Sequence, residues 1–269
     1  MMGTITVEQT SPKIATITFA SPPVNTIVPE TVSELHDAVV ELSDDASIQV
    51  VILTSATEGF FFNHFDLTQA SSFPVLTDGT PTWVDLVLRL SKAPFVSIAK
   101  IRGRTRGGGD ELALACDLRY ASAEFASFGQ PEVGTGILPG GGAGERLPRT
   151  IGRDRSLEVI LSSADYDADI AERYGWVTRT LPDAELDQFV NTLAARLAGF
   201  DRAVLAAAKA QVNRASLPPD ADLLHEYTEY SESLSWSSFQ HGFTRLGKLF
   251  AEHGVDVELR LGDYLGTAG

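Results

Sequence analysis

The sequence predicts an α/β fold with a largely parallel sheet and a helical C-terminal region. Up to about residue 180, short apolar segments rich in β-branched residues alternate with amphipathic segments of helical period. This rhythm favours parallel strands with helices packed outside the sheet. Beyond Pro182 only helical patterns follow. We therefore expect a core over residues 1–182 and a helical region over residues 183–269, in a chain whose 43% hydrophobic content suffices for a sizeable core.

Strands are expected where apolar and β-branched residues run together between turn signals. The segments ITVEQ and KIATITFA predict two short strands joined by a polar turn. QVVILTS and PFVSIAKI are apolar enough to be buried on both faces, and DLRYAS and EFASFG predict two more strands. The predicted strands cover residues 5–9, 13–20, 49–55, 94–101, 117–122 and 124–129.

Helices are expected where apolar residues recur every three or four positions. The clearest case begins near a proline, and Val32, Leu35, Val39 and Leu42 fall on one of its faces. The predicted helices cover residues 29–45, 82–92, 187–200, 201–215 and a long stretch from 221 to about 253.

Composition excludes several classes of partner. The formal charge of −15 would repel nucleic acids and anionic membranes, so we expect neither as a partner. The single cysteine, Cys116, excludes an intramolecular disulfide and a multi-cysteine metal site, and it fits a reducing compartment. The first residues lack the pattern of a signal peptide, and no apolar run approaches the roughly 18 residues of a membrane span. We therefore expect a cytoplasmic protein.

The first candidate site is the stretch GGGDE at residues 107–111, which precedes an alanine-rich segment of helical character. Glycine lets backbone approach a ligand closely, and a helix N-terminus offers unpaired N–H groups and partial positive charge. Together they suggest a place that holds negative charge beside an ionisable side chain, Glu111. The stretch has neither the Gly-Lys-Ser/Thr of a P-loop nor dinucleotide-binding glycine spacing. A tight turn where a helix packs closely on a strand explains the glycines equally well.

The second candidate is Pro131-Glu132, which lies in a loop with glycines on both sides. A glutamate in such a loop is commonly solvated. Glu111 and Glu132, however, each follow a predicted buried strand, so they can meet at the carboxyl edge of one parallel sheet, where open α/β folds place their sites. Paired carboxyls can divide the roles of acid and base when their environments separate their pKa values.

The third candidate is FFFNHFDLTQ, residues 60–69. Its phenylalanines, together with Trp83, suit either the core or the wall of an acyl pocket. His64 and Asp66 invite a metal-binding interpretation, but none of the five histidines pairs with another at a usual ligand spacing. We therefore expect no metal site.

Two long segments resemble those of the crotonase superfamily, the enoyl-CoA hydratase/isomerase group. One, KAPFVSIAKIRGRTRGGGDELALACDLRYAS, is similar to the family's lysine-proline strand followed by Gly-Gly-Gly-x-Glu-Leu-Ala and Cys-Asp. The other, FGQPEVGTGILPGGGAGERLPRTIGRDRSLEVILSS, is similar to its Phe-Gly-x-Pro-Glu and Pro-Gly-x-Gly-Gly pattern. The resemblance covers roughly residues 5–182. It implies a spiral of ββα turns with a helical C-terminal trimerisation region, and hence a homotrimer or a hexamer built as a dimer of trimers.

The resemblance also implies a thioester enzyme without a cofactor, since the substrate carries the coenzyme A. Crotonases polarise the thioester carbonyl of an acyl-CoA with two backbone N–H groups. By position the donors here are Gly108 and Asn63, while Glu111 activates a water and Glu132 protonates Cα. The reaction implied is hydration of the 2,3-double bond of a 2-enoyl-CoA. Residues expected to contact the substrate are His64, Phe65, Asp66, Gly107, Gly109, Pro131 and Gly134.

Other functions remain open on the same resemblance. They are double-bond isomerisation, thioester hydrolysis, decarboxylation, or non-catalytic binding of an acyl-CoA or a protein. The presence of both Glu111 and Glu132 favours hydration, because isomerases of the family often keep only one of these acids. Asp110 is expected to point away from the site, because neighbours on a helix lie about 100° apart.

The chain departs from the family pattern in two places. Asn63-His64 stands where the family usually has Ala-Gly, which either alters the loop without new chemistry or brings His64 to the ligand. The C-terminal segment lacks the family's usual final pattern, so the residues that meet the CoA 3′-phosphate are not identified. Arg102, Arg104 and Arg106 form a basic cluster that either serves phosphate groups or pairs with nearby carboxylates.

Overall fold

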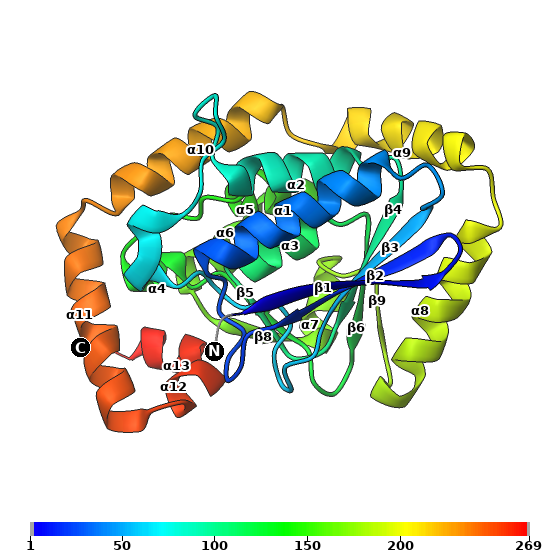
Figure 1. The fold of residues 1–269 in the computed structure, drawn as a ribbon. Coiled ribbons are helices and arrows are strands. Elements are labelled where there is room, and N and C mark those ends of the chain that lie inside the picture. The colour runs from blue at the N-terminus through cyan, green and yellow to red at the C-terminus, as the bar shows by residue number, and fades with distance from the viewer. Residues whose placement is uncertain (1–2, 268–269) are drawn as a thin grey trace.

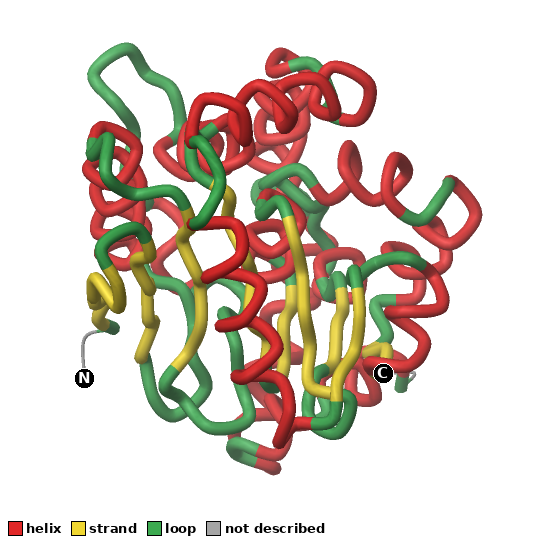
Figure 2. The backbone as a smooth tube through the Cα atoms, turned by 90° about the vertical axis from the view of Figure 1, so that its right-hand side faces the viewer, coloured by secondary structure: helices red, strands yellow, loops and turns green. Residues whose placement is uncertain are grey.

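The computed structural model describes residues 3–267, and its centre is a six-stranded sheet. The strand order is β1-β2-β3-β4-β6-β9, with β1 antiparallel to β2 and every other neighbouring pair parallel. Figure 2 shows these strands running side by side. The bounds are β1 Thr4–Ser11, β2 Ile14–Ala20, β3 Val50–Ser55, β4 Val96–Ile101, β6 Leu118–Ser122 and β9 Arg179–Leu181. The predicted α/β architecture with a parallel sheet is confirmed.

Both faces of the sheet are covered, as the apolar strand segments predict. Alternate side chains such as Ile17, Leu53 and Ala99 enter the main core with α1 (Pro29–Asp44), α2 (Thr82–Lys92) and α3 (Gly108–Ala115). The intervening side chains, among them Val50, Ile52 and Ile98, pack on α8 (Asp183–Ala198). The first helix of the predicted helical region therefore packs directly on the sheet (Figure 1).

A second, three-stranded sheet lies beside the first. It pairs β5 with β7 in parallel and β7 with β8 in antiparallel register. Short helices follow β7 and β8 and lead back to β9, while the 3-10 helix η1 lies earlier in the chain, between β3 and α2. The bounds are η1 Leu67–Ser72, β5 Arg104–Arg106, β7 Ser127–Gly129, α4 Glu132–Thr135, α5 Ala143–Thr150, α6 Arg153–Ser162, β8 Asp165–Asp167 and α7 Ala168–Tyr174.

The remaining helices run around the outside of the molecule to the far side of the sheet (Figure 1). They are α9 Arg202–Ser216, α10 Asp220–Ser233, α11 Ser237–His253, α12 Asp256–Leu259 and α13 Leu261–Gly266. The single helix predicted from 221 to 253 is wrong, because the chain turns between α10 and α11. Trp236 has an extended ψ of 147° there. The surrounding segment is rich in serine, which competes for backbone hydrogen bonds and favours helix ends. None of the helices in residues 3–267 has the length and apolar character needed to cross a membrane.

Candidate active site

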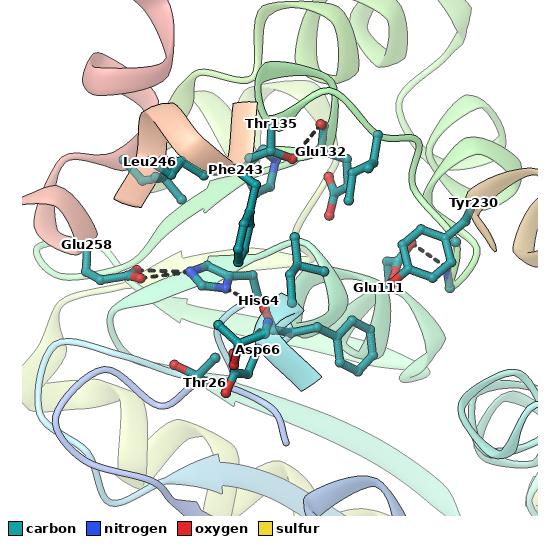
Figure 3. A pocket seen from close by; sticks show the side chains of 18 of the residues that line it. Thr26, His64, Asp66, Glu111, Glu132, Thr135, Tyr230, Phe243, Leu246 and Glu258 are labelled. Atoms are coloured by element: carbon teal, nitrogen blue, oxygen red, sulfur yellow. Dashed lines mark hydrogen bonds and ion pairs between the residues drawn. The ribbon is translucent and has the colours of Figure 1, made fainter. Parts of the chain in front are cut away.

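A cavity of about 400 Å³ lies between the loops that follow β3 and β7, the start of α3, and the C-terminal helices (Figure 3). Its wall is largely apolar, and its few polar groups include two of the predicted acids. The residues that line it include Thr26, His64, Phe65, Asp66, Leu67, Trp83, Glu111, Pro131, Glu132, Ile137, Tyr227, Tyr230, Phe243, Leu246, Gly247, Phe250, Glu258 and Leu261. An apolar cavity with a few convergent polar groups is typical of a small-molecule site.

Glu111 lies in the first turn of α3 and is only 2% exposed. Its Oε1 accepts hydrogen bonds from the N–H groups of Gly141 (2.7 Å) and Ala143 (3.3 Å). Burial raises the pKa of Glu111, and these amide donors, with the charge of Arg146, act in the opposite direction. A carboxylate held in this way has one oxygen fixed by the protein and can accept a proton from a bound water through the other.

Glu132 begins α4 and faces the same cavity (Figure 3). Its Oε2 is buried and has no hydrogen-bond partner among the residues that the structure describes. Its Oε1 lies close to Gly107, since a Cβ at that glycine would come within 2.5 Å of it. Burial first, and then the charge of Glu111, raise the pKa of Glu132 well above its usual range. The structure thus brings the two predicted acids together in different environments.

The amide of Asn63 is already occupied. Its N–H donates to the carbonyl of Asn25 (3.1 Å), and its own carbonyl accepts from the Gly109 N–H (3.0 Å). The expectation that Asn63 supplies a free backbone donor is therefore wrong. The reason is that the loop carrying this residue is held between two backbone segments, which the sequence motif alone does not reveal.

The N–H of Phe65, two residues further along the loop, has no protein acceptor among residues 3–267. The neighbouring His64 C=O and Asp66 N–H both bond to Ile27, at 3.0 and 2.9 Å, so the Phe65 N–H points to the opposite side. Within residues 3–267, neither this N–H nor that of Gly108 donates to a protein acceptor. The two residues are in contact, because a Cβ on Gly108 would come within 2.7 Å of the Phe65 ring.

The two residues that depart from the family motif share one partner. The Nε2 of His64 lies 3.0 Å from Oε1 of Glu258, and the Nδ2 of Asn63 donates to Oε2 of the same carboxylate (3.0 Å). The Nδ1 of His64 lies 3.0 Å from the carbonyl of Phe65. Burial alone lowers the pKa of His64, but the charge and hydrogen bond of Glu258 outweigh it, and the net effect is a raised pKa. The pKa of Glu258 in turn is lowered to about 2 by His64, Arg106 and Asn63, against the effect of burial.

The other predicted contact residues divide into two groups. Asp66 and Pro131 line the cavity, as do His64 and Phe65. Gly107, Gly109 and Gly134 do not line it. Gly107 makes room for Glu132, Gly109 packs against the carbonyls of the preceding loop, and Gly134 donates to Ser163 Oγ (2.8 Å). These three glycines position the site, and whether any of them meets a substrate stays a prediction.

Asp110 points away from the cavity, as helix geometry predicts. It accepts hydrogen bonds from Gln130 Nε2 (2.7 Å) and Trp176 Nε1 (2.9 Å). Burial raises its pKa to about 8. Asp110 therefore joins α3 to residues beyond β7 and α7, and its side chain does not line the cavity.

The predicted basic cluster pairs with protein groups. Arg102 bonds to Asp183 and Asp187 on α8. Arg106 forms two hydrogen bonds to Asp165, at 2.6 and 2.7 Å, and Arg104 donates to a carbonyl in α12. The expected pairing with nearby carboxylates therefore holds for Arg102 and Arg106, whereas Arg104 bonds to backbone carbonyls.

Sequence reasoning missed the wall contributed by the C-terminal helices. Phe243, Leu246 and Phe250 on α11, with Glu258 and Leu261, line the cavity although they lie far from the recognised motifs. The only available signal was the apolar spacing at 243, 246 and 250, which fits one face of a helix.

Comparison with known proteins agrees with the geometry. A family model described as enoyl-CoA hydratase/isomerase matches residues 9–252. A probable enoyl-CoA hydratase of Mycobacterium tuberculosis is 34% identical over 79% of this chain and 82% of its own length. The short-chain-enoyl-CoA hydratase of Clostridium acetobutylicum is 31% identical over 75% of this chain and 78% of its own. A crystal structure from Streptomyces avermitilis, provisionally named an enoyl-CoA hydratase, has a TM-score of 0.91 and 42% identity, covering 98% of this chain and 97% of that one.

Proposed function

The chain belongs to the enoyl-CoA hydratase/isomerase family, and from this premise we propose that it adds water across the 2,3-double bond of a 2-enoyl-CoA thioester. One observation carries the proposal: the buried Glu111 and the half-buried Glu132 line a single apolar cavity in different electrostatic environments. An isomerisation needs only one group to move a proton. Two acids suit a reaction in which one proton leaves a water while another is added to carbon.

The thioester carbonyl is expected to bind where the N–H groups of Gly108 and Phe65 converge. Both amides lack a protein acceptor among the described residues; Gly108 begins α3, and the loop at Phe65 is held by its bridge to Ile27. Donors fixed in this way stabilise the negative charge that develops on the thioester oxygen when water attacks C3. The positive end of the α3 dipole adds to this effect, since Gly108 is the first residue of that helix.

The proton transfers then follow from the two environments. Glu111, whose Oε1 accepts hydrogen bonds from the Gly141 and Ala143 amides, removes a proton from the water in its ionised form as the water oxygen bonds to C3. Glu132, whose pKa is raised by burial and by the charge of Glu111 so that its protonated form is favoured, delivers its proton to C2. The Nε1 of Trp83 is a second buried group in the same cavity without a partner among residues 3–267, and we expect it to orient the polar atoms of the bound thioester.

The first experiment is mass spectrometry of the purified protein with a panel of 2-enoyl-CoA thioesters of increasing chain length. We expect one or more members to gain the mass of one water. Release of free CoA or of carbon dioxide would replace this proposal with a hydrolase or a decarboxylase. A panel that keeps its mass while a shifted double bond is detected by chromatography would replace it with an isomerase.

Substituting the proposed acid gives a second prediction. Glu132→Gln is expected to lower kcat for hydration by about a hundredfold, because the amide cannot deliver a proton to C2. In the wild type, kcat/KM should fall as pH rises through the raised pKa of Glu132, and the variant should lack this decline. Because the pKa of Glu132 is raised in the folded protein, the free energy of unfolding should fall as pH rises from the ordinary carboxyl pKa to the raised one, and the variant should lack this loss. A kcat equal to that of the wild type would contradict the assignment.

The family resemblance also leads us to propose a homotrimer or a hexamer. Val204 and Val212 are 64% and 65% exposed on α9, a helix with no buried residue, so this apolar face is available for a second copy. Light scattering coupled to size exclusion should give three or six times the 28.9 kDa chain mass.

A further inference from the structure

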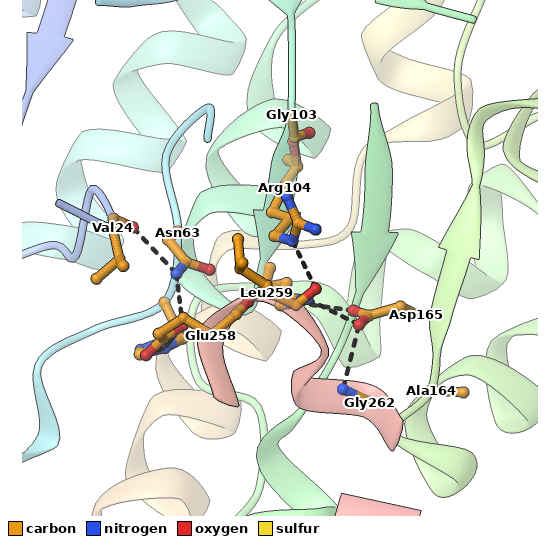
Figure 4. Close-up of polar contacts among 12 residues, drawn as sticks. Val24, Asn63, Gly103, Arg104, Ala164, Asp165, Glu258, Leu259 and Gly262 are labelled. Carbon is orange, nitrogen blue, oxygen red and sulfur yellow. Dashed lines mark hydrogen bonds and ion pairs between the residues drawn. The ribbon is translucent and has the colours of Figure 1, made fainter. Parts of the chain in front are cut away.

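The two departures from the family motif meet at a single carboxylate 195 residues further along the chain. Asn63 and His64 both bond Glu258, which is only 4% exposed (Figures 3 and 4). A loop with alanine and glycine at these positions has no side chain that could reach α12. Asn63 and His64, where the family usually has Ala-Gly, therefore share a specific partner, Glu258, which a merely altered loop would not require.

Three further contacts hold the same segment (Figure 4). Arg106 donates to the carbonyl of Glu258 (2.7 Å), and Arg104 Nε donates to the carbonyl of Leu259 (2.8 Å). Asp165, which is paired with Arg106, accepts from the N–H of Gly262 (3.1 Å). The backbone of α12 is thus attached to the second sheet, while the Glu258 side chain attaches it to the loop that carries Phe65.

The segment so attached forms one side of the cavity. Phe243, Leu246, Phe250 and Leu261 present apolar side chains to the space opposite Glu111 and Trp83. The His64 imidazole lies between this wall and the Phe65 carbonyl, within hydrogen-bond distance of Phe65 O and Glu258 at its two nitrogens. An imidazolium satisfies both contacts as a donor, because each of its nitrogens carries a hydrogen.

Several charged groups face His64. Glu258 on α12 favours the imidazolium and Arg106 on β5 disfavours it. Asp66 is the nearest acid in the same loop, and its pKa is lowered in part by His64. Glu132 on α4 lies on the far side of Gly107, whose added Cβ would come within 3.4 Å of His64 Cβ. Of these groups only Glu258 bonds to the ring, so the charge of His64 depends on this one carboxylate.

We propose that Glu258 is a positioning residue of this active site. Through Asn63 and His64 it fixes the Phe65 amide at the proposed thioester site. It also holds residues 237–266 in place as the apolar wall that receives the acyl chain. The inference rests on the proposed hydration and deepens it, since it assigns the acyl wall to this segment and makes an extended apolar acyl group the substrate class. The charged pair holds when Glu258 is ionised and His64 is protonated. It weakens as pH rises through the raised pKa of His64, and also as pH falls towards the lowered pKa of Glu258.

The test compares Glu258→Gln with Glu252→Gln, a control in which an exposed glutamate of the same segment is changed. Two measurements need no substrate. The His64 titration is followed by NMR, and hydrogen exchange is measured over residues 61–66 and 237–266. In Glu258→Gln we expect the pKa of His64 to fall below its ordinary value, because burial and Arg106 then dominate, and both segments should exchange faster. Glu252→Gln should match the wild type in both measurements.

The kinetics of hydration then test whether Glu258 positions the loop and the wall. In Glu258→Gln, kcat/KM for hydration is expected to fall about tenfold, the scale of one lost charge-assisted hydrogen bond. KM should rise more for long acyl chains than for short ones. An unchanged His64 titration together with unchanged exchange would overturn the proposal, and so would an unchanged kcat/KM profile. A wild type that hydrates no thioester would refute the proposed function instead, and the titration and exchange would still decide whether Glu258 holds the loop and the wall together.

Discussion

Glu111→Gln is expected to reduce kcat for enoyl-CoA hydration by about a thousandfold, the upper part of the range for removing a general base. Glutamine keeps the shape of the side chain and can still accept hydrogen bonds from the Gly141 and Ala143 amides, so the loop should keep its position. Only the ability to take a proton from water is lost. Steady-state kinetics with the preferred thioester measures kcat, and titration with a saturated acyl-CoA shows whether binding persists.

The matched control is Glu145→Gln on α5. Glu145 is paired with Arg149 and lies outside the cavity lining, so its kcat should stay near that of the wild type. If Glu111→Gln binds the saturated acyl-CoA and still hydrates at the wild-type rate, the assignment of the base fails. If it loses binding together with turnover, the role of Glu111 is structural, and the proposed chemistry needs another base.

Gly109→Ala is expected to destabilise the fold by about 3 kcal/mol, the upper end of the cost of overpacking. A Cβ at this position would overlap the carbonyl of Phe62 and come within 2.8 Å of that of Asn63. Both are backbone groups that cannot rotate aside. The loop must therefore move off α3, and the position of the Phe65 amide relative to that of Gly108 should change with it. Denaturant unfolding measures the stability, and hydration should fall in parallel.

Gly266→Ala supplies the comparison for this substitution. No heavy atom lies within 4 Å of the added Cβ there, and the residue ends a short helix, so the effect should not exceed about 1 kcal/mol in either direction. A Gly109→Ala variant as stable and as active as Gly266→Ala would show that the close approach of the loop to α3 is not required.

The sequence predicts the parallel sheet well because its strands are buried on both faces and read as continuous apolar runs. It does not predict β5, β8 and β9. Each of these has only three residues, and β5 consists of Arg104, Thr105 and Arg106, a composition that favours no strand. Such strands are fixed by their partners in the sheet and not by their own residues.

The same distinction applies to the candidate site. Glu111 and Glu132 could be predicted because each follows a buried strand within a recognisable motif. Whether Asn63 or Phe65 has the free backbone N–H could not be predicted from the sequence. It depends on Asn25 and Ile27, which bond to the loop from an earlier part of the chain. Glu258 was equally inaccessible, since its partner residues precede it by 194 and 195 positions.

That separation has a consequence for the order in which the molecule is built. The sheet and both glutamates are complete once residues up to about 181 are available, but the far wall of the cavity comes from residues 243–261. We therefore expect a stage during synthesis in which Glu111 and Glu132 are present but the cavity is still open to solvent on the side of residues 243–261. Contacts of such long range form late, because the loop they close is costly in entropy. The binding site is thus among the last parts of the protein to be completed, and we expect it to be the first to open when the fold is stressed.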